Sequence, residues 1–261
     1  LAGGVGGAKL AFGLTKALSP EDLIIAVNTG DDFDHLGLRI CPDIDTVLYT
    51  LGKMANTETG WGQANETWNF MEALKAIGGE TWFQLGDRDL ATHVERTRRL
   101  QAGELLSVIT ADFADRFGIN HPIVPATDEP MPTIVNTPDG DLSFQDYFVR
   151  LQCAPTVTGF EFGGAAAAKP SSAISKAFES GQIEAVVICP SNPYVSIAPI
   201  LAVPAISDFI YNSGTPVIVV SPIVGGQAIK GPAAKMMKEL CAPPSALSIA
   251  QMVGAATMAA V

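Results

Sequence analysis

The feature that most constrains this chain is a buried strand that runs directly into a group of carboxylates. Residues 23–27 are uninterruptedly apolar, and five aspartates occur within the fifteen residues from Asp31 to Asp45. In an open α/β sheet, ligands bind beyond the carboxyl ends of the strands, and carboxylates crowded there repel one another unless a cation offsets them. We therefore expect Asp31 and Asp45 to contact metal or substrate. Asp34 and Asp43 are expected to be turn or helix-capping residues.

The composition predicts an ordinary cytoplasmic protein with a large core. The 261 residues are 48% hydrophobic and 16% charged, which suits one elaborate α/β domain. A net charge of −11 without a basic stripe argues against binding to nucleic acid or to an anionic membrane. The four cysteines form no CxxC pair, and no apolar run reaches about 18 residues, so disulfides and a spanning helix are not expected. The chain starts at Leu1 without a methionine, so we expect that both termini are incomplete.

The order of the expected elements predicts a single α/β, Rossmann-like domain over residues 1–261. Residues 1–50 form a βαβ start, which favours a mostly parallel sheet. Residues 50–120 carry helical spacing and are predicted to be a helical insertion over the active site. Pro138–Asp141 separates two strand-like stretches and predicts a β-hairpin. The expected helices are 8–18, 67–77, 90–101, 107–117, 173–180 and 233–240, with a mostly helical stretch at 197–210; the expected strands are 23–27, 133–137, 142–151, 185–188 and 216–220.

The chain begins with a glycine-rich loop between an expected strand and an expected helix. Backbone N–H groups of Gly4, Gly6 and Gly7 can approach an anion closely at a helix N-terminus, which predicts a nucleotide-binding loop that includes Lys9. Lys9 stands where a dinucleotide fingerprint has its third glycine, and the GxxxxGK[ST] pattern of a P-loop is absent. A tight turn that brings helix and strand close together explains the glycines equally well.

Two later strands also end in polar or glycine-rich loops. Ser191 and Asn192 follow the strand 185–188, and a Ser-Pro-Ile-Val-Gly-Gly string at 221–226 follows the next, with Lys230 shortly after it. Serine and asparagine offer donors and acceptors that suit a nucleotide base, ribose or phosphate. Taken alone, each loop is interpreted as a simple turn. Four polar or glycine-rich strand ends on one sheet edge together predict a ligand site.

The expected insertion carries further candidate residues. Asp87 or Asp89 is expected to cap the helix at 90–101, and Arg88 at its mouth could clamp a phosphate. His93 is expected to be a structural, hydrogen-bonding histidine. All three tryptophans lie here; core packing is their ordinary role, yet Trp61 stands between two glycines and could present its indole to a flat ring.

The combined strings resemble a known family. Eight of them occur in order over nearly the whole chain, from GGVGGAKL and VNTGDDF through GLRICPDIDTVLYTL and LGDRDLATH to SPIVGGQAIKGPAAKMM. Together they resemble the 2-phospho-L-lactate transferase family of coenzyme F-420 biosynthesis. The resemblance implies an enzyme that joins the deazaflavin Fo to a phosphorylated C3 acid carried on GMP, with Mg²⁺, and that releases GMP. It also implies a Rossmann-like sheet with a helical insertion and a homodimer.

The resemblance also implies roles for the strand-end acids. Asp45 matches a family aspartate associated with Fo and metal, and Asp31 matches an acid implicated in metal binding. A metal held by Asp31 and Asp45 would neutralise the donor diphosphate. The primary ribityl hydroxyl of Fo would attack the phosphorus distal to guanosine, and Asp32 could orient or deprotonate that hydroxyl, or act behind the metal ligands.

The remaining candidate residues are expected to bind the two substrates. Gln84 occupies a position where some relatives have a lysine near Fo, and it joins Trp61, Arg88 and Asp45 as an expected Fo contact. The glycine loop and residues 191–192 match the region implied for the guanylyl donor. The stretch 252–261 departs from the family pattern, which continues for some tens of residues.

Two other classes of function stay open at this point. A gluconeogenesis-regulating bacterial family shares the glycine loop and an acidic strand end, so a non-catalytic nucleotide-binding regulator is an alternative. A nicotinamide-dependent dehydrogenase is weakened by the missing third glycine. No residue decides whether phospholactate, phosphoenolpyruvate or 3-phosphoglycerate is transferred.

Overall fold

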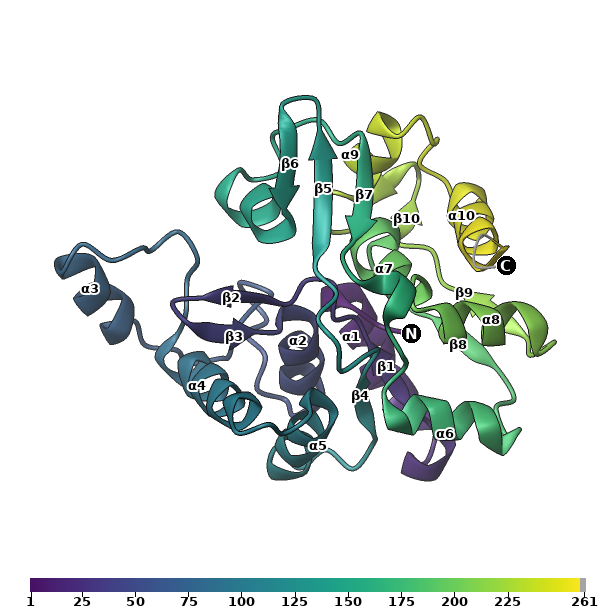
Figure 1. The fold of residues 1–261 in the computed structure, drawn as a ribbon, viewed down its shortest axis with the longest axis horizontal. Coiled ribbons are helices and arrows are strands. Elements are labelled where there is room, and N and C mark those ends of the chain that lie inside the picture. Colours follow the sequence, from purple (N-terminus) through teal and green to yellow (C-terminus); the bar gives the residue numbers. More distant parts are fainter. Residues whose placement is uncertain (259–261) are drawn as a thin grey trace.

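The computed structural model describes residues 1–258, and a parallel sheet lies at its centre (Figure 1). Two parallel pairs form it: β1 (Ile25–Val27) with β4 (Ile123–Pro125), and β8 (Val186–Ile188) with β9 (Val217–Val219). Leu1 and Ala2 join the pairs, since Cys189 N donates to Leu1 O at 2.9 Å and Ala2 N donates to Ala26 O at 2.9 Å. The order is therefore β9, β8, residues 1–2, β1 and β4, which confirms the predicted α/β class with a parallel sheet.

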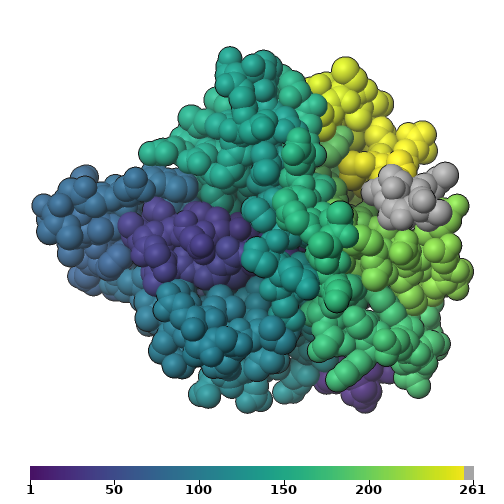
Figure 2. All heavy atoms as spheres, in the orientation of Figure 1, coloured from purple at the N-terminus to yellow at the C-terminus, as the bar shows by residue number. Residues whose placement is uncertain are grey.

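The three predicted helices of the insertion are present, close to their predicted bounds. They are α3 (Asn69–Ala76), α4 (Asp87–Gln101) and α5 (Leu106–Arg116). A small hairpin of β2 (Phe33–His35) and β3 (Leu38–Ile40), which the sequence did not indicate, precedes them. In Figure 2 this hairpin, in purple, reaches the surface between the blue insertion and the teal strands of the antiparallel sheet. The acidic stretch is thus a hairpin followed by the helix that begins at Pro42.

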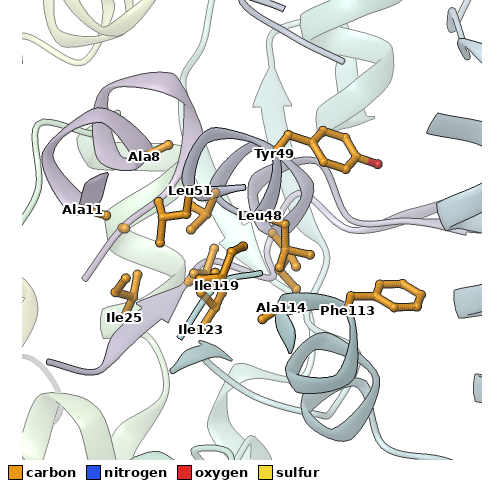
Figure 3. Close-up of a cluster of buried hydrophobic side chains, with 14 of the residues drawn as sticks. Ala8, Ala11, Ile25, Leu48, Tyr49, Leu51, Phe113, Ala114, Ile119 and Ile123 are labelled. Atoms are coloured by element: carbon orange, nitrogen blue, oxygen red, sulfur yellow. The ribbon is translucent and has the colours of Figure 1, made fainter. Parts of the chain in front are cut away.

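Strand alternation distributes the core over both faces of the parallel sheet. Ile25 and Val27 of β1 pack with α1 (Gly4–Ala17), α2 (Pro42–Leu51) and α5, whereas Ala26 between them packs on the opposite face. Figure 3 shows Leu48, Leu51 and Ala114 converging with Ile119 and Ile123 on the first face, while the ring of Tyr49 extends away from them. Helices of the C-terminal half cover the second face.

The hairpin predicted around Pro138–Asp141 is confirmed, but its second arm is shorter than predicted. β5 (Thr133–Thr137) pairs with β6 (Gly140–Ser143), and the chain then turns into the wide helical turn η2 (Asp146–Arg150) instead of continuing as a strand. A third strand, β7 (Gly159–Phe162), pairs with β5 on its other side.

The remaining elements complete the two halves of the fold. They are η1 (Pro20–Asp22), η3 (Ala165–Ala167), α6 (Ser172–Ser180), η4 (Pro193–Ile197), α7 (Ala198–Leu201), α8 (Pro204–Asn212), β10 (Ile223–Val224), β11 (Gln227–Ala228), α9 (Ala233–Glu239) and α10 (Ala246–Met258). Among the described helices no single one is long and apolar enough to cross a membrane, although the bent pair Pro193–Leu201 and Pro204–Asn212 passes by length and composition.

Candidate functional site

The glycine-rich start is the first turn of a helix and not a free loop. Helix α1 begins at Gly4, not at Ala8 as predicted, and its first N–H groups already have partners. Gly3 N donates to Ser191 Oγ at 3.0 Å, and Gly4 N donates to the Asp43 carboxylate at 2.7 Å. Asp43 thus places a negative charge where the helix dipole favours an anion.

Close packing accounts for the glycines of this turn. A Cβ atom at Gly6 would collide with the carbonyl oxygen of Pro190, and one at Gly7 would collide with the hydroxyl of Ser191. The alternative explanation given by the sequence, a tight approach of helix and strand, therefore describes these positions. Lys9 is exposed on α1.

Asn192 also has a local structural role. Its side-chain oxygen accepts a hydrogen bond from Tyr194 N at 3.0 Å and caps η4, and its amide nitrogen lies 3.4 Å from the Met236 sulfur. Nucleotide binding by the glycine turn, Ser191 and Asn192 stays a prediction.

Asn28, Asp31 and Asp43 form the first polar group at the carboxyl edge of the sheet. The Asn28 amide donates to Asp31 Oδ1 at 3.0 Å, to Asp43 Oδ2 at 2.9 Å and to the carbonyl of Val195 at 3.0 Å. All three side chains are buried. Burial raises the pKa of Asp43 to about 6 and that of Asp31 well above its usual range, with repulsion from Asp43 adding to the shift at Asp31.

Asp32 is the least satisfied member of this region. It is 3% exposed, and both of its carboxylate oxygens lack a hydrogen-bond partner in the described structure. Burial raises its pKa to about 7, although the Arg39 guanidinium, 3.9 Å away, and the nearby Cys41 thiol lower it. The hydroxyls of Thr29 and Thr133 beside the same turn are also buried without partners. Unsatisfied polar atoms gathered at one turn indicate a ligand site.

Asp45 belongs to a second polar group. Arg96 donates to both Asp45 oxygens, one of them at 3.1 Å, and it also lies 3.3 Å from His93 Nδ1. His93 Nε2 lies 3.3 Å from Asp89, which accepts a hydrogen bond from the Tyr49 hydroxyl at 2.6 Å. Asp45, Asp89 and His93 offer ligand atoms close enough together to hold a metal ion, but Arg96 already neutralises Asp45.

The structure therefore groups Asp31 with Asp43 and not with Asp45. Successive helix residues turn by about 100°, so Asp43 and Asp45 point to nearly opposite sides of α2. Asp43 turns toward Asn28 and Asp31, and Asp45 turns toward α4. The sequence interpretation missed Asp43 and Asn28 as site residues. A signal was present for Asn28, because it is the first residue after the strand.

The three insertion residues expected to contact Fo share no described side-chain contact with either polar group. Trp61 is 47% exposed and packs edge-on against Trp68, with ring centroids 6.0 Å apart. Gln84 is exposed, lines a small cavity of about 220 Å³ with Trp68, and donates to the carbonyl of Thr81. Arg88 is exposed, and its backbone N–H donates to Glu66 at 2.8 Å. No described contact joins these three side chains to Asp31 or Asp45.

The amino-acid sequence matches a known protein family. Residues 1–258 match the family model described as 2-phospho-L-lactate transferase CofD. The chain belongs to this family. It is 42% identical over 259 residues to a phosphoenolpyruvate transferase of Streptomyces coelicolor, covering 97% of this chain and 81% of that protein. It is 38% identical to a phosphoenolpyruvate transferase of Mycolicibacterium smegmatis, covering 98% of this chain and 82% of that protein.

Solved structures share the fold. The chain resembles the crystal structure of protein BH3568 from Bacillus halodurans with a TM-score of 0.56 and 15% identity, over 84% of this chain and 66% of that one. A second structure of that protein, described as a member of the UPF0052 family, matches with a TM-score of 0.54 and 16% identity, over 82% of this chain and 64% of that one. At this level of identity the likeness concerns the fold alone, and it supports the α/β architecture predicted for this chain.

Proposed function

We propose that this CofD family member transfers a phosphorylated C3 acid from a guanosine-diphosphate-linked donor to the deazaflavin Fo and releases GMP, in coenzyme F-420 biosynthesis. The family match and the transferase relatives support the coarser statement, a transferase of the phosphoenolpyruvate or phospholactate type. Both relatives named above are phosphoenolpyruvate transferases, which favours phosphoenolpyruvate as the acid.

The observation that carries the proposal is the buried acid group at the carboxyl edge of the sheet. Asp31, Asp32 and Asp43 are each at most 7% exposed, and Asp32 has no hydrogen-bond partner for either oxygen. Three buried carboxylates without a matching cation are costly, and a hard divalent cation with oxygen ligands offsets that cost. These residues therefore fit Mg²⁺, and Asp31 and Asp43 would hold it.

The chemistry follows from what each side chain can do. A bound Mg²⁺ supplies charge neutralisation for the donor diphosphate. Asn28 holds the Asp31 and Asp43 carboxylates in fixed positions through its amide. Asp32, whose pKa is about 7, can accept the proton of the ribityl hydroxyl while that oxygen bonds to the phosphorus distal to guanosine. The phosphorus–oxygen bond to GMP breaks, and GMP leaves with the electron pair.

The test is product analysis with purified components. The protein is incubated with Fo, Mg²⁺ and each guanylylated acid, and product masses and GMP release are measured. Asp32→Asn should lower kcat by about 10²-fold or more, the range of a lost general base. Asp34→Asn is the matched control, because Asp34 lies two residues away with 74% of its side chain exposed. No transfer of any of the three acids by the wild type would contradict the proposal.

A further inference from the structure

Two π-helical turns of this chain contact the buried acid group at the carboxyl edge of the sheet. In η2, Leu151 N donates to Asp146 O at 2.8 Å across a spacing of five residues. In η4, Ile197 N donates to Asn192 O at 3.1 Å across the same spacing. No other π-helical turn occurs among the described residues. Such turns are rare and frequently mark functional sites, so their contacts with the acid group point to a role in this one.

The first turn holds the backbone of Asp31. Gln145, the residue before η2, is 4% exposed, and its side-chain amide donates to the backbone oxygen of Asp31 at 3.2 Å. The preceding peptide is also fixed, because Thr133 N of β5 donates to Gly30 O at 2.8 Å. A buried carbonyl is costly to leave without a donor. Gln145 therefore fixes the path of the chain at Asp31 and, with it, the direction of the Asp31 carboxylate.

The second turn holds the carboxylate of Asp43. Burial raises the pKa of Asp43, and hydrogen bonds from the Asn28 amide, the Gly4 N–H and the Ser196 hydroxyl oppose this shift. Ser196 belongs to η4 and is 4% exposed. Its side chain and the Asp43 carboxylate converge on Gly3, where a Cβ atom would collide with both. Ser196 is therefore a buried donor that fixes Asp43 from the side of η4.

A shared hydrophobic core fixes the two turns relative to each other. Tyr147 of η2 and Val195 of η4 are both buried and belong to the same hydrophobic cluster. Val195 also connects this cluster to the acid group, because its carbonyl accepts a hydrogen bond from the Asn28 amide at 3.0 Å. The spacing of the two carboxylates thus depends on how η2 packs against η4, and not only on the elements that carry the two aspartates.

We propose that Gln145 and Ser196 are positioning residues that set the geometry of a divalent-cation site. The inference rests on the proposed function, in which Asp31 and Asp43 hold the cation. Gln145 acts through the backbone of Asp31, and Ser196 acts through the carboxylate of Asp43. Groups that hydrogen-bond to metal-binding residues orient them, and losing one typically weakens metal binding by about 10–100-fold.

The cation affinity of the free protein tests the proposal without any substrate. Mn²⁺ binding is measured by calorimetry and by the electron paramagnetic resonance signal of free Mn²⁺, at a temperature where every variant is folded. Melting temperatures are measured on the same samples. Gln145→Met keeps the length of the side chain and removes its donor, and Ser196→Ala removes the hydroxyl. Each substitution should weaken Mn²⁺ binding about tenfold or more, whereas a purely structural role would change only the melting temperature.

Matched substitutions elsewhere separate positioning from stability. Gln63→Met replaces the other buried glutamine among the described residues, and Ser207→Ala removes a buried hydroxyl of α8 that donates to the Leu201 carbonyl. Neither side chain has a described contact with the acid group. Both variants should therefore bind Mn²⁺ as the wild type does, whatever their melting temperatures. Ser196→Thr, which keeps the hydroxyl, should retain most of the affinity.

The positioning proposal and the transferase proposal fail in different ways. If Gln145→Met and Ser196→Ala bind Mn²⁺ like the wild type, the positioning role is overturned, and transfer by the wild type still stands. Absence of Mn²⁺ binding by the wild type also overturns it, as does an equal loss of affinity in Gln63→Met and Ser207→Ala. Mn²⁺ binding that depends on Gln145 and Ser196, without transfer of any acid, supports the positioning role and refutes the transferase.

Discussion

Arg96 lies inside α4 with 1% of its side chain exposed, and its guanidinium holds the carboxylate of Asp45. It also donates to the backbone oxygen of Arg39 at 3.4 Å, while the neighbouring Thr97 accepts from Arg39 N at 2.7 Å. The segment 39–45, which includes Asp43, is therefore fixed to α4 at both ends, through the backbone of Arg39 and the carboxylate of Asp45. Although burial lowers the pKa of Arg96, the Asp45 charge outweighs it and raises that pKa. The ion pair with Arg96 therefore gives Asp45 a structural role, holding α2 against α4.

Removing one partner of this pair should be costly. Arg96→Met leaves Asp45 buried and unpaired, which we expect to lower the free energy of unfolding by about 3–5 kcal/mol. Arg98→Met is the matched control on the same helix, because Arg98 pairs with Glu95 at the surface and should change stability by less than about 1 kcal/mol. Urea unfolding followed by circular dichroism measures both. Equal effects of the two substitutions would show that the buried pair contributes nothing special.

Single residues also show where sequence interpretation of the site succeeded and where it ended. The strand-end position of Asp31 and Asp32 follows from the apolar run before them, and the structure places both in the buried acid group. Asp43 and Asp45 cannot be distinguished in this way. They are two residues apart, and only the start and rotation of α2 decide which of them faces Asp31.

At the scale of elements, α3 and α4 cap each other's N-termini. The carboxylate that caps α4 comes from the segment before α3, and the one that caps α3 comes from the first residue of α4. Glu66 accepts from the N–H groups of Arg88 and Asp89 at 2.8 and 2.9 Å at the start of α4. Asp87 accepts from Phe70 N at 3.0 Å and from Asn69 N at 3.1 Å at the start of α3. The prediction that Asp87 or Asp89 caps α4 is therefore wrong, because Glu66, which lies outside the helix, accepts its first N–H groups instead.

Asp87 gives a pH-dependent prediction for this element. Hydrogen bonds from Thr67, the Phe70 N–H and Asn69 lower its pKa from 3.8 to about 2. A carboxyl whose pKa is lower in the folded state stabilises the protein above the unfolded pKa, and this contribution is lost as the pH falls through the folded value. Asp87→Ala should lower the melting temperature at pH 6, and the difference from wild type should shrink toward pH 2. Asp115→Ala, at an exposed position of α5, is the control. A difference in melting temperature that does not depend on pH would contradict the low pKa assigned to Asp87.

Helical periodicity and apolar runs explain which elements the sequence predicted. The helices α3, α4, α5, α6 and α9 show a helical period, and their predicted bounds are within a few residues of the observed ones. The three-residue strands β1, β8 and β9 were predicted because each lies within an apolar run, whereas β2, β3, β10 and β11, with two or three residues each, contain no such run and are too short for an alternating pattern. Their pairing depends on tertiary contacts that no local pattern contains.

At the scale of the whole molecule, an acidic chain keeps three buried carboxylates, Asp31, Asp32 and Asp43, together at one sheet edge. The net charge is −11, and among the described residues the only cation within ion-pair distance of these three is Arg39, at 3.9 Å from Asp32. Like charges held together oppose folding unless a ligand neutralises them. A ligand that binds only the folded chain then stabilises the whole protein by mass action.

Divalent cations should therefore raise the melting temperature of the free enzyme. At a concentration about 100-fold above Kd, Mg²⁺ or Mn²⁺ should add about 2.7 kcal/mol, which for a chain of this size corresponds to a shift of about 5–10 °C. Asp31→Asn and Asp43→Asn should each remove most of the shift, and Asp34→Asn should keep it, since Asp34 is exposed at the surface. Differential scanning fluorimetry with and without EDTA measures the shift in each variant. If Asp45→Asn removes the shift and Asp43→Asn keeps it, the metal is bound by the pair expected from the sequence, and Arg96 must release Asp45 when the cation binds.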